Sequence, residues 1–172
     1  MTRLFTDFDY IDKAVLMMQS EVCDKTLAAP SAPGYCMLTV LCNAFYQPEK
    51  LFTVPPHCFA PQPGVDSAVV AFTAHPAPIV AGAVNSAPSI AKTTHPVPIV
   101  ELSERELFIS VVRAAFATRR KTLANCLVAA DLAPDRASAE AAAARAGIPS
   151  SARGESLSAQ TFAVLARELM RM

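Results

Sequence analysis

Apolar residues in the first 72 positions form short runs that polar and turn-forming residues separate. The run Ala14–Met18 has the length of a strand, and an uninterrupted apolar run suits a strand covered on both faces, as in a parallel sheet. A second strand is predicted at Lys50–Val54 and a third at Val65–Phe72, where β-branched residues are mixed with small ones. With the helices between them, these strands predict an α/β fold of which the chain holds one edge of the sheet.

Two helices are predicted between the first and second strands. Ser20 can accept a hydrogen bond as the N-cap of a helix over Glu21–Ala28, and Pro30 ends that helix. The segment Leu38–Tyr46 is apolar apart from one Asn, which is typical of a buried helix, and Pro48 follows it. The predicted order is therefore strand, helix, helix, strand, loop, strand.

The last third of the chain has helical periodicity. Ser103, with Glu106 three residues later, has the pattern of a capping box that starts a helix. Two further helices are predicted at 122–130 and 135–146, and Ser158 should cap the last one. The apolar positions at helical spacing are Phe108, Val112, Ala115, Phe116, Leu123, Leu127, Phe162, Leu165, Ala166 and Leu169. This part predicts a small all-α domain.

Between the two parts the composition changes to Ala, Pro, Val, Thr and Ser with almost no charge. The hexapeptide His75–Val80 returns almost unchanged as His95–Val100. Because its prolines disfavour regular structure, this segment predicts a flexible linker or a surface insertion. We expect the α/β part to cover residues 1–73, the linker residues 74–101 and the helical domain residues 102–172.

The connection between the second and third predicted strands holds four prolines within nine residues, Pro55, Pro56, Pro61 and Pro63. Proline fixes φ and lacks a backbone N–H, so this segment should be a stiff extended loop rather than a helix or a central strand. One aromatic residue, Phe59, lies between the proline pairs. Two interpretations are open at this point: Phe59 plugs the end of the sheet, as most aromatic residues pack, or the loop presents it for binding.

The bulk composition is that of a globular protein. Of the 172 residues 52% are hydrophobic and only five are Gly. A chain of this length can form one domain, or one domain with a small addition. No apolar run approaches the length of a membrane span. Asp7, Asp9 and Asp12 precede the first apolar run, unlike the basic flank of a signal peptide, so we expect a cytoplasmic protein with no membrane partner.

The cysteines and histidines do not predict a metal site. The five cysteines show no paired spacing, which favours reduced thiols. His57 and Cys58 are the only close pair of metal-ligating residues, and adjacent side chains of an extended segment point apart. We therefore expect no bound metal.

The formal net charge is zero, but the charges are distributed unevenly. Residues 107–130 contain no acidic residue, whereas Arg113, Arg119, Arg120 and Lys121 all lie there. The last three fall at a predicted helix junction, where backbone amides can also face a phosphate. Such a patch on a neutral protein favours contact with phosphate, and the alternative is a solvated helix face.

Four segments resemble, in order and spacing, motifs of the small-subunit ribosomal RNA adenine dimethyltransferases. Phe59–Val69 is similar to F-x-P-x-P-K-V-x-S-x-V, and Ala114–Asn125 is similar to A-A-F-x-x-R-R-K-T-L-x-N. Val15–Val22 resembles V-L-M-x-Q-x-E-V, and Leu157–Ala166 resembles the C-terminal end of the family. Together they cover nearly the whole chain except the linker.

The resemblance implies a Rossmann-like class I methyltransferase that uses S-adenosylmethionine to dimethylate N6 of two adjacent adenines near the 3′ end of small-subunit rRNA. The three strands would be the last three of its sheet, and Phe59, with Pro61 beside it, matches the aromatic residue that stacks on the extruded adenine. The helical domain would dock the rRNA or the pre-ribosomal small subunit, and the protein would act as a monomer. The implied RNA-binding residues are Arg113, Arg119, Arg120, Lys121 and Asn125.

Other parts of the family pattern have no counterpart in these residues. The glycine-rich cofactor loop, the acidic residue at the cofactor ribose and the Asn-Leu/Ile-Pro-Tyr/Phe motif that grips the amine are absent, and no two glycines have G-x-G spacing. Gly64 and Ala124 stand where the family has basic residues, which weakens attraction to RNA. We therefore expect a truncated form that is inactive alone, with no catalytic or cofactor-binding residue. The alternatives are a non-catalytic rRNA-binding or assembly module and a shortened gene model.

Overall fold

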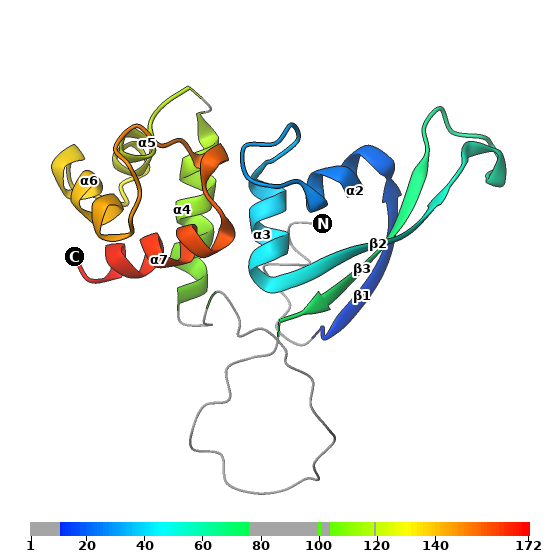
Figure 1. Ribbon diagram of the computed structural model, residues 1–172, viewed down its shortest axis with the longest axis horizontal. Coiled ribbons are helices and arrows are strands. Elements are labelled where there is room, and N and C mark those ends of the chain that lie inside the picture. The colour runs from blue at the N-terminus through cyan, green and yellow to red at the C-terminus, as the bar shows by residue number, and fades with distance from the viewer. Residues whose placement is uncertain (1–10, 76–99, 101–103, 119) are drawn as a thin grey trace, which may run out of the picture.

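The structure is a computed structural model that describes residues 11–75, 100, 104–118 and 120–172. Figure 1 shows a sheet at one end of the molecule and a group of helices at the other. Helix α3 (Met37–Phe45) lies between them and contacts both α4 (Arg105–Ala117) and α7 (Ala159–Met170). The arrangement agrees with the predicted α/β part followed by an all-α part.

Within the described residues the sheet has three strands, β1 (Lys13–Gln19), β2 (Tyr46–Val54) and β3 (Ser67–Ala74), in the order β1-β3-β2. The central strand β3 is antiparallel to both neighbours, and Leu16 of β1 lies opposite Val70. The face that carries these two residues packs against α2 (Ser20–Leu27) and α3. The helices therefore cover one face of the sheet.

The strand at Ala14–Met18 forms, but its predicted parallel pairing and double-sided burial are wrong. β1 pairs antiparallel with β3, and the burial of its side chains alternates. Val15 and Met17 are 55% and 58% exposed, whereas Leu16 points to the packed face. An apolar run shows which residues can be buried. Which of them are buried depends on whether one face of the sheet or both are covered by other elements.

The other strand boundaries also differ from the predictions. β2 begins at Tyr46, which the sequence had placed in the preceding helix, and it includes Pro48. Proline is tolerated there because β2 is an edge strand. β3 begins at Ser67, two residues after the predicted start, and Ala74 extends it into the segment predicted as linker. Residues 76–99, with most of the repeat, lie outside the described residues.

Helix α2 has a different start from the one predicted. Ser20 is its first residue, Gln19 occupies the N-cap position, and no side chain caps the helix. The capping box that the structure does contain belongs to α3. The Thr39 hydroxyl accepts from the backbone N–H of Cys36 at 3.1 Å, a pairing that the sequence analysis did not identify.

The helical part consists of α4, α5 (Leu123–Ala129), α6 (Arg136–Arg145) and α7, with a 3₁₀ turn, η3 (Gly154–Ser156), before α7. The predicted cap of α7 is confirmed, because the Ser158 hydroxyl accepts from the N–H of Thr161 at 3.1 Å. Helix α4 begins at Arg105, and Glu104 occupies the N-cap position without a side-chain hydrogen bond. Ser103 lies outside the described residues.

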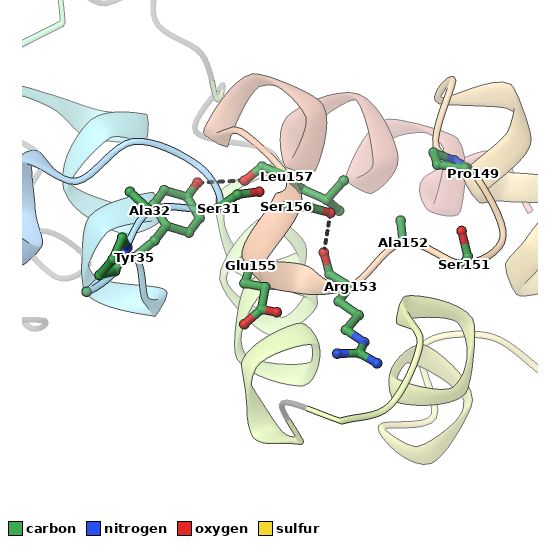
Figure 2. Close-up of a pocket in the computed structure, with 12 residues that line it drawn as sticks. Ser31, Ala32, Tyr35, Pro149, Ser151, Ala152, Arg153, Glu155, Ser156 and Leu157 are labelled. Carbon is green, nitrogen blue, oxygen red and sulfur yellow. Dashed lines mark hydrogen bonds between the residues drawn. The ribbon is translucent and has the colours of Figure 1, made fainter.

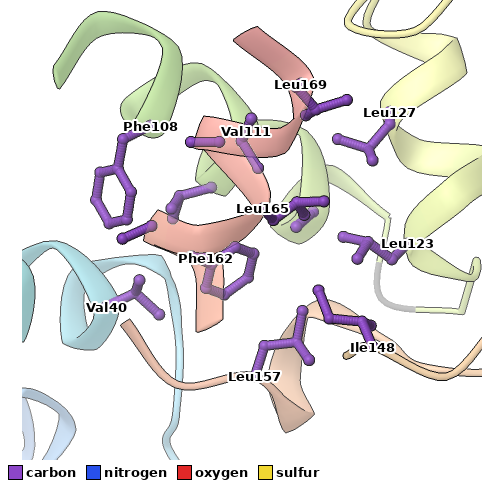
Figure 3. Packing of buried hydrophobic residues seen from close by; sticks show 14 of the residues in the cluster. Val40, Phe108, Val111, Leu123, Leu127, Ile148, Leu157, Phe162, Leu165 and Leu169 are labelled. Carbon is purple, nitrogen blue, oxygen red and sulfur yellow. The ribbon is translucent and has the colours of Figure 1, made fainter. Parts of the chain in front are cut away.

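One hydrophobic cluster joins α3 to the four helices of the helical part (Figure 3). Of the ten apolar positions predicted to be buried there, Phe116 is partly buried and the others are buried. Val40 and Leu41 of α3 belong to this cluster, whereas Cys42 belongs to the smaller cluster under the sheet. A continuous core therefore crosses from the α/β part into the helical part.

Two further observations bear on the expected absences. In the described part of the chain, no helix is long and apolar enough to cross a membrane. Within the same residues, no three His, Cys, Asp or Glu side chains converge as metal ligands. The five cysteines are free thiols, and three of them, Cys23, Cys42 and Cys126, are buried.

Candidate functional site

The proline-rich connection between β2 and β3 projects from the end of the sheet that points away from the helical part (Figure 1). It contains a single 3₁₀ turn, η1 (Pro56–Cys58), where an entirely extended loop was predicted. The N–H groups of Cys58 and Phe59 donate to the carbonyls of Pro55 and Pro56, each at 3.1 Å. A proline at the first position of the turn costs no hydrogen bond, because that N–H would have no partner.

Phe59 is held at the end of this turn and is half-buried. Its neighbours Cys58, Ala60 and Pro61 are exposed, and the Ala60–Pro61 peptide bond is cis. Phe59 is absent from both hydrophobic clusters and from the partly buried residues that pack against them. This position does not fit a residue that plugs the core, and it leaves part of the ring accessible to a ligand.

The predicted basic residues lie on and around the junction between α4 and α5. Arg113 is exposed on α4, Arg120 and Lys121 are exposed in the junction, and Asn125 is half-buried on α5. The N–H of Lys121 donates to the carbonyl of Thr118 at 3.2 Å, which makes the junction a tight turn. Arg119 lies outside the described residues.

The charges of this junction are not compensated. Among the residues that the structure describes, Arg113, Arg120 and Lys121 form no ion pair. Other arginines of the helical part do, in the pairs Arg136–Glu140, Arg145–Glu168, Arg167–Glu104 and Arg171–Glu168. Uncompensated cations on one side of a neutral protein create a local positive potential, which attracts polyanions.

Two hollows adjoin the junction. Lys121 and Asn125 line a shallow one of about 330 Å³ together with Arg136, the first residue of α6. The resemblance to the family motif put Lys121 and Asn125 in one predicted RNA-binding set, and the two residues lie four positions apart in the sequence. It gave no signal for Arg136, which reaches the hollow only through the packing of α6 on α5.

A larger hollow of about 760 Å³ lies between residues 31–35 and residues 149–157 (Figure 2). Two hydrogen bonds cross between these segments: Ser31 N–H donates to the carbonyl of Glu155 at 2.9 Å, and the Tyr35 hydroxyl donates to that of Leu157 at 2.6 Å. Burial raises the pKa of Tyr35 to about 12, so the phenol keeps its proton and donates at neutral pH. The hollow therefore has fixed walls.

The described residues do not fit S-adenosylmethionine, the cofactor that the resemblance implies. A cofactor cradle needs a glycine whose missing Cβ leaves room for the ligand. At Gly154 that room is filled by the backbone of Ala115, and at Gly34 the Lys25 side chain lies 3.6 Å away. Gly64 and Gly147 face open space with nothing within 4 Å. None of these four glycines forms a cofactor pocket.

Comparison with known proteins identifies the family. Residues 1–87 match the family model described as ribosomal RNA adenine dimethylase. Over 152 residues the chain is 40% identical to ribosomal RNA small subunit methyltransferase A of Pelotomaculum thermopropionicum, covering 88% of this chain and 45% of the relative. The protein belongs to the ribosomal RNA adenine dimethylase family. The relative of the same name from Geobacillus thermodenitrificans is 37% identical, covering 98% of this chain and 51% of its own length.

Solved structures show the same fold. A dimethyladenosine transferase from Plasmodium falciparum has a TM-score of 0.67 at 18% identity, covering 98% of this chain and 62% of that chain. The 23S rRNA methyltransferase ErmE has a TM-score of 0.58 at 21% identity, covering 94% of this chain and 56% of that chain. The partial methyltransferase sheet followed by helices, predicted from the sequence, is therefore confirmed. The chain spans about half the length of the curated relatives it matches.

Proposed function

We propose that this chain serves the S-adenosylmethionine-dependent dimethylation of N6 on two adjacent adenines near the 3′ end of small-subunit rRNA. Its part is to recognise the substrate: the Phe59 loop holds the target base, and the α4–α5 junction binds the RNA backbone. The observation that carries the proposal is the position of Phe59, half-exposed at the end of a braced turn and outside both clusters.

Phe59 would stack on an adenine that has left the RNA stack. Chemistry on a base requires this extrusion, and stacking on an aromatic ring returns about 1–3 kcal/mol per base. The two backbone hydrogen bonds of η1 and the prolines around it hold the ring before the base arrives. Pro61, exposed two residues further on, would contact the same base.

The helical part would hold phosphates of the same RNA at the other end of the molecule (Figure 1). Arg113, Arg120 and Lys121 are exposed and lack acidic partners among the described residues, so RNA need not displace a carboxylate to reach them. The RNA-binding set that we propose is Arg113, Arg119, Arg120, Lys121 and Asn125. Binding through such cations weakens as the salt concentration rises.

Methyl transfer would need a cofactor-binding segment that these 172 residues do not supply, because no G-x-G spacing or amine-gripping motif occurs among them. The chain alone should therefore bind RNA without methylating it. A non-catalytic role in rRNA binding or ribosome assembly is the second candidate. It is favoured by the combination of an uncompensated basic junction and glycines that form no cradle.

A methyl-transfer assay on small-subunit particles tests the catalytic part of the proposal. The chain alone should give no dimethyladenine with labelled S-adenosylmethionine, and the full-length relative from Geobacillus thermodenitrificans serves as the positive control. Robust dimethylation by the chain alone would overturn the claim that it needs a further segment.

The base-stacking role is tested with an RNA in which 2-aminopurine replaces one of the two adjacent adenines. When 2-aminopurine stacks on Phe59, the fluorescence of the 2-aminopurine should change. Phe59→Ala should abolish that change and weaken RNA binding by about 1–3 kcal/mol. Phe52→Ala is the matched control, because Phe52 is 57% exposed on β2 outside the loop. Equal effects of the two substitutions would exclude a specific role for Phe59.

A further inference from the structure

The two edge strands of the sheet differ in how well they are protected against pairing with a further strand. The strand β2 contains Pro48 and the charged residues Glu49 and Lys50, and its register with β3 shifts between Lys50 and Phe52. Proline, charge and an irregular register are features by which edge strands avoid pairing with other chains. The edge formed by β2 is therefore protected.

The edge formed by β1 lacks these features. Its register with β3 runs without a shift from Lys13 to Gln19, and the strand contains no proline. Its one charged residue is Lys13, at the first position, and five apolar residues follow. Figure 1 shows β1 along the margin of the sheet, and within the described residues no strand pairs with its outer side. A row of backbone N–H and C=O groups is therefore open to a further strand.

Side chains on both faces of β1 remain accessible at this edge. Ala14, Leu16 and Met18 lie on the face that α2 and α3 cover, and they are only partly buried. Val15 and Met17 lie on the open face and are 55% and 58% exposed. A strand that pairs with β1 would therefore gain apolar contacts on both faces of the sheet as well as backbone hydrogen bonds.

The side chains of β1 are complementary to a second copy of the same strand. Antiparallel pairing about Leu16 would place Val15 of one copy opposite Met17 of the other, so that apolar residues meet. Lys13 would lie opposite Gln19, so no like charges face each other. Such pairing has a two-fold axis normal to the sheet, which keeps the covering helices of both copies on one face.

We propose that two copies of this chain pair through β1, antiparallel about Leu16, and form one continuous sheet. The inference goes beyond the proposed function and differs from the monomer that the family resemblance implies. The assembly ends at two copies, because among the described residues each copy has one unprotected edge. Neither the Phe59 loop nor the α4–α5 junction includes residues of β1, so both remain free in the dimer.

The test is sedimentation velocity of the 172-residue chain over a range of concentrations, with a mass of 18.3 kDa for one copy. The unmodified chain should sediment as a dimer that dissociates on dilution. Val15→Lys and Met17→Glu should each weaken dimerisation about tenfold, because each places a charge opposite an apolar residue of the second copy.

An equimolar mixture of these two variants tests the register. In the mixed dimer the ammonium introduced at position 15 lies opposite the carboxylate introduced at position 17, and the remaining Met17 and Val15 face each other. The mixture should therefore recover most of the lost affinity. A mixture that dimerises as weakly as each variant alone would overturn pairing about Leu16.

Phe52→Lys is the matched control. Phe52 is 57% exposed on the same open face as Met17, but it lies on the protected strand β2. The substitution should change the dimer affinity less than about twofold, because it lies away from the paired edge. Circular dichroism of dilute samples reports folding separately, and the spectra of all three variants should match that of the unmodified chain, since the substituted positions are exposed.

Amide hydrogen exchange locates the contact. The protection of β1 amides should rise with protein concentration, because pairing gives hydrogen-bond partners to the N–H groups on its outer side. A chain that is monomeric at every concentration would overturn the proposal, and so would assemblies larger than two copies. A dimer that Phe52→Lys weakens as much as Val15→Lys would also overturn it, because the open faces would then be in contact instead of the edges. No measurement uses RNA, so the result is independent of the proposed function.

Discussion

The sheet and the helical part contain similar apolar residues but bury them to different extents. Apolar positions from the four helices of the helical part and from α3 close on one another in one large cluster. In the sheet only one face is covered, by a small cluster around Val70 and Phe72. On the other face Val15, Met17 and Phe52 remain exposed. A helical bundle completes its own core, whereas an antiparallel sheet can leave one of its two faces open to water.

The difference also affects what each part contributes to the candidate site. The helical part gives the basic junction and the loop 149–157 a rigid base, because α4, α5 and α7 pack on one core. The Phe59 loop extends from a three-stranded sheet with two edge strands. Stability should therefore depend on the helical part much more than on the outer face of the sheet.

The largest expected effect comes from a pair of Phe→Ala substitutions. Phe162 is fully buried in the helical part (Figure 3). Its ring centroid lies 6.1 Å from that of Phe116. Phe162→Ala should lower the free energy of unfolding by about 3–5 kcal/mol, since it leaves a cavity. Phe52→Ala on the exposed sheet face should lower it by less than about 1 kcal/mol. Urea denaturation of both variants measures the difference, and equal losses would break the comparison.

The same contrast explains how much of the fold could be predicted. In helices the spacing of apolar residues identifies the buried face directly, and Phe108, Phe162 and Leu165 are buried as predicted. For β1 the spacing was uninformative, because every residue from Ala14 to Met18 is apolar. Which of them face the core depends on α2 and α3, which cover one side only. That information is not local to the strand.

The candidate site shows the same limit. Lys121 and Asn125 could be grouped because both fall in the motif that resembles the family, and they do line one hollow. Arg136 could not, because only the packing of α6 on α5 brings it to that hollow. The roles of Phe59 and the basic residues stay predictions that rest on the family motif and on exposure.

A second pair of substitutions tests whether the helical part depends on close packing of the loop 149–157. Gly154→Ala places a methyl group 2.8 Å from the Ala115 carbonyl oxygen, so the loop must shift. We expect a loss of about 1–3 kcal/mol in the free energy of unfolding, typical of overpacking. Gly64→Ala, with nothing within 4 Å, should change it by less than about 1 kcal/mol, in the stabilising direction. If Gly154→Ala and Gly64→Ala had the same melting temperature, the loop 149–157 would pack less closely on α4 than its contacts indicate.

The smallest effect concerns the starts of two helices, α7 in the helical part and α2 beside the sheet. Ser158 caps α7 by accepting from the N–H of Thr161, whereas Ser20 at the start of α2 caps nothing. Ser158→Ala should cost about 1 kcal/mol, because it leaves an N–H of the first turn without a partner. Ser20→Ala should be neutral or slightly stabilising, since alanine has the higher helix propensity. Urea denaturation measures both losses, which are read from the shift of the midpoint when the m-value is unchanged. A larger loss for Ser20→Ala than for Ser158→Ala would restore the cap that the sequence predicted for α2.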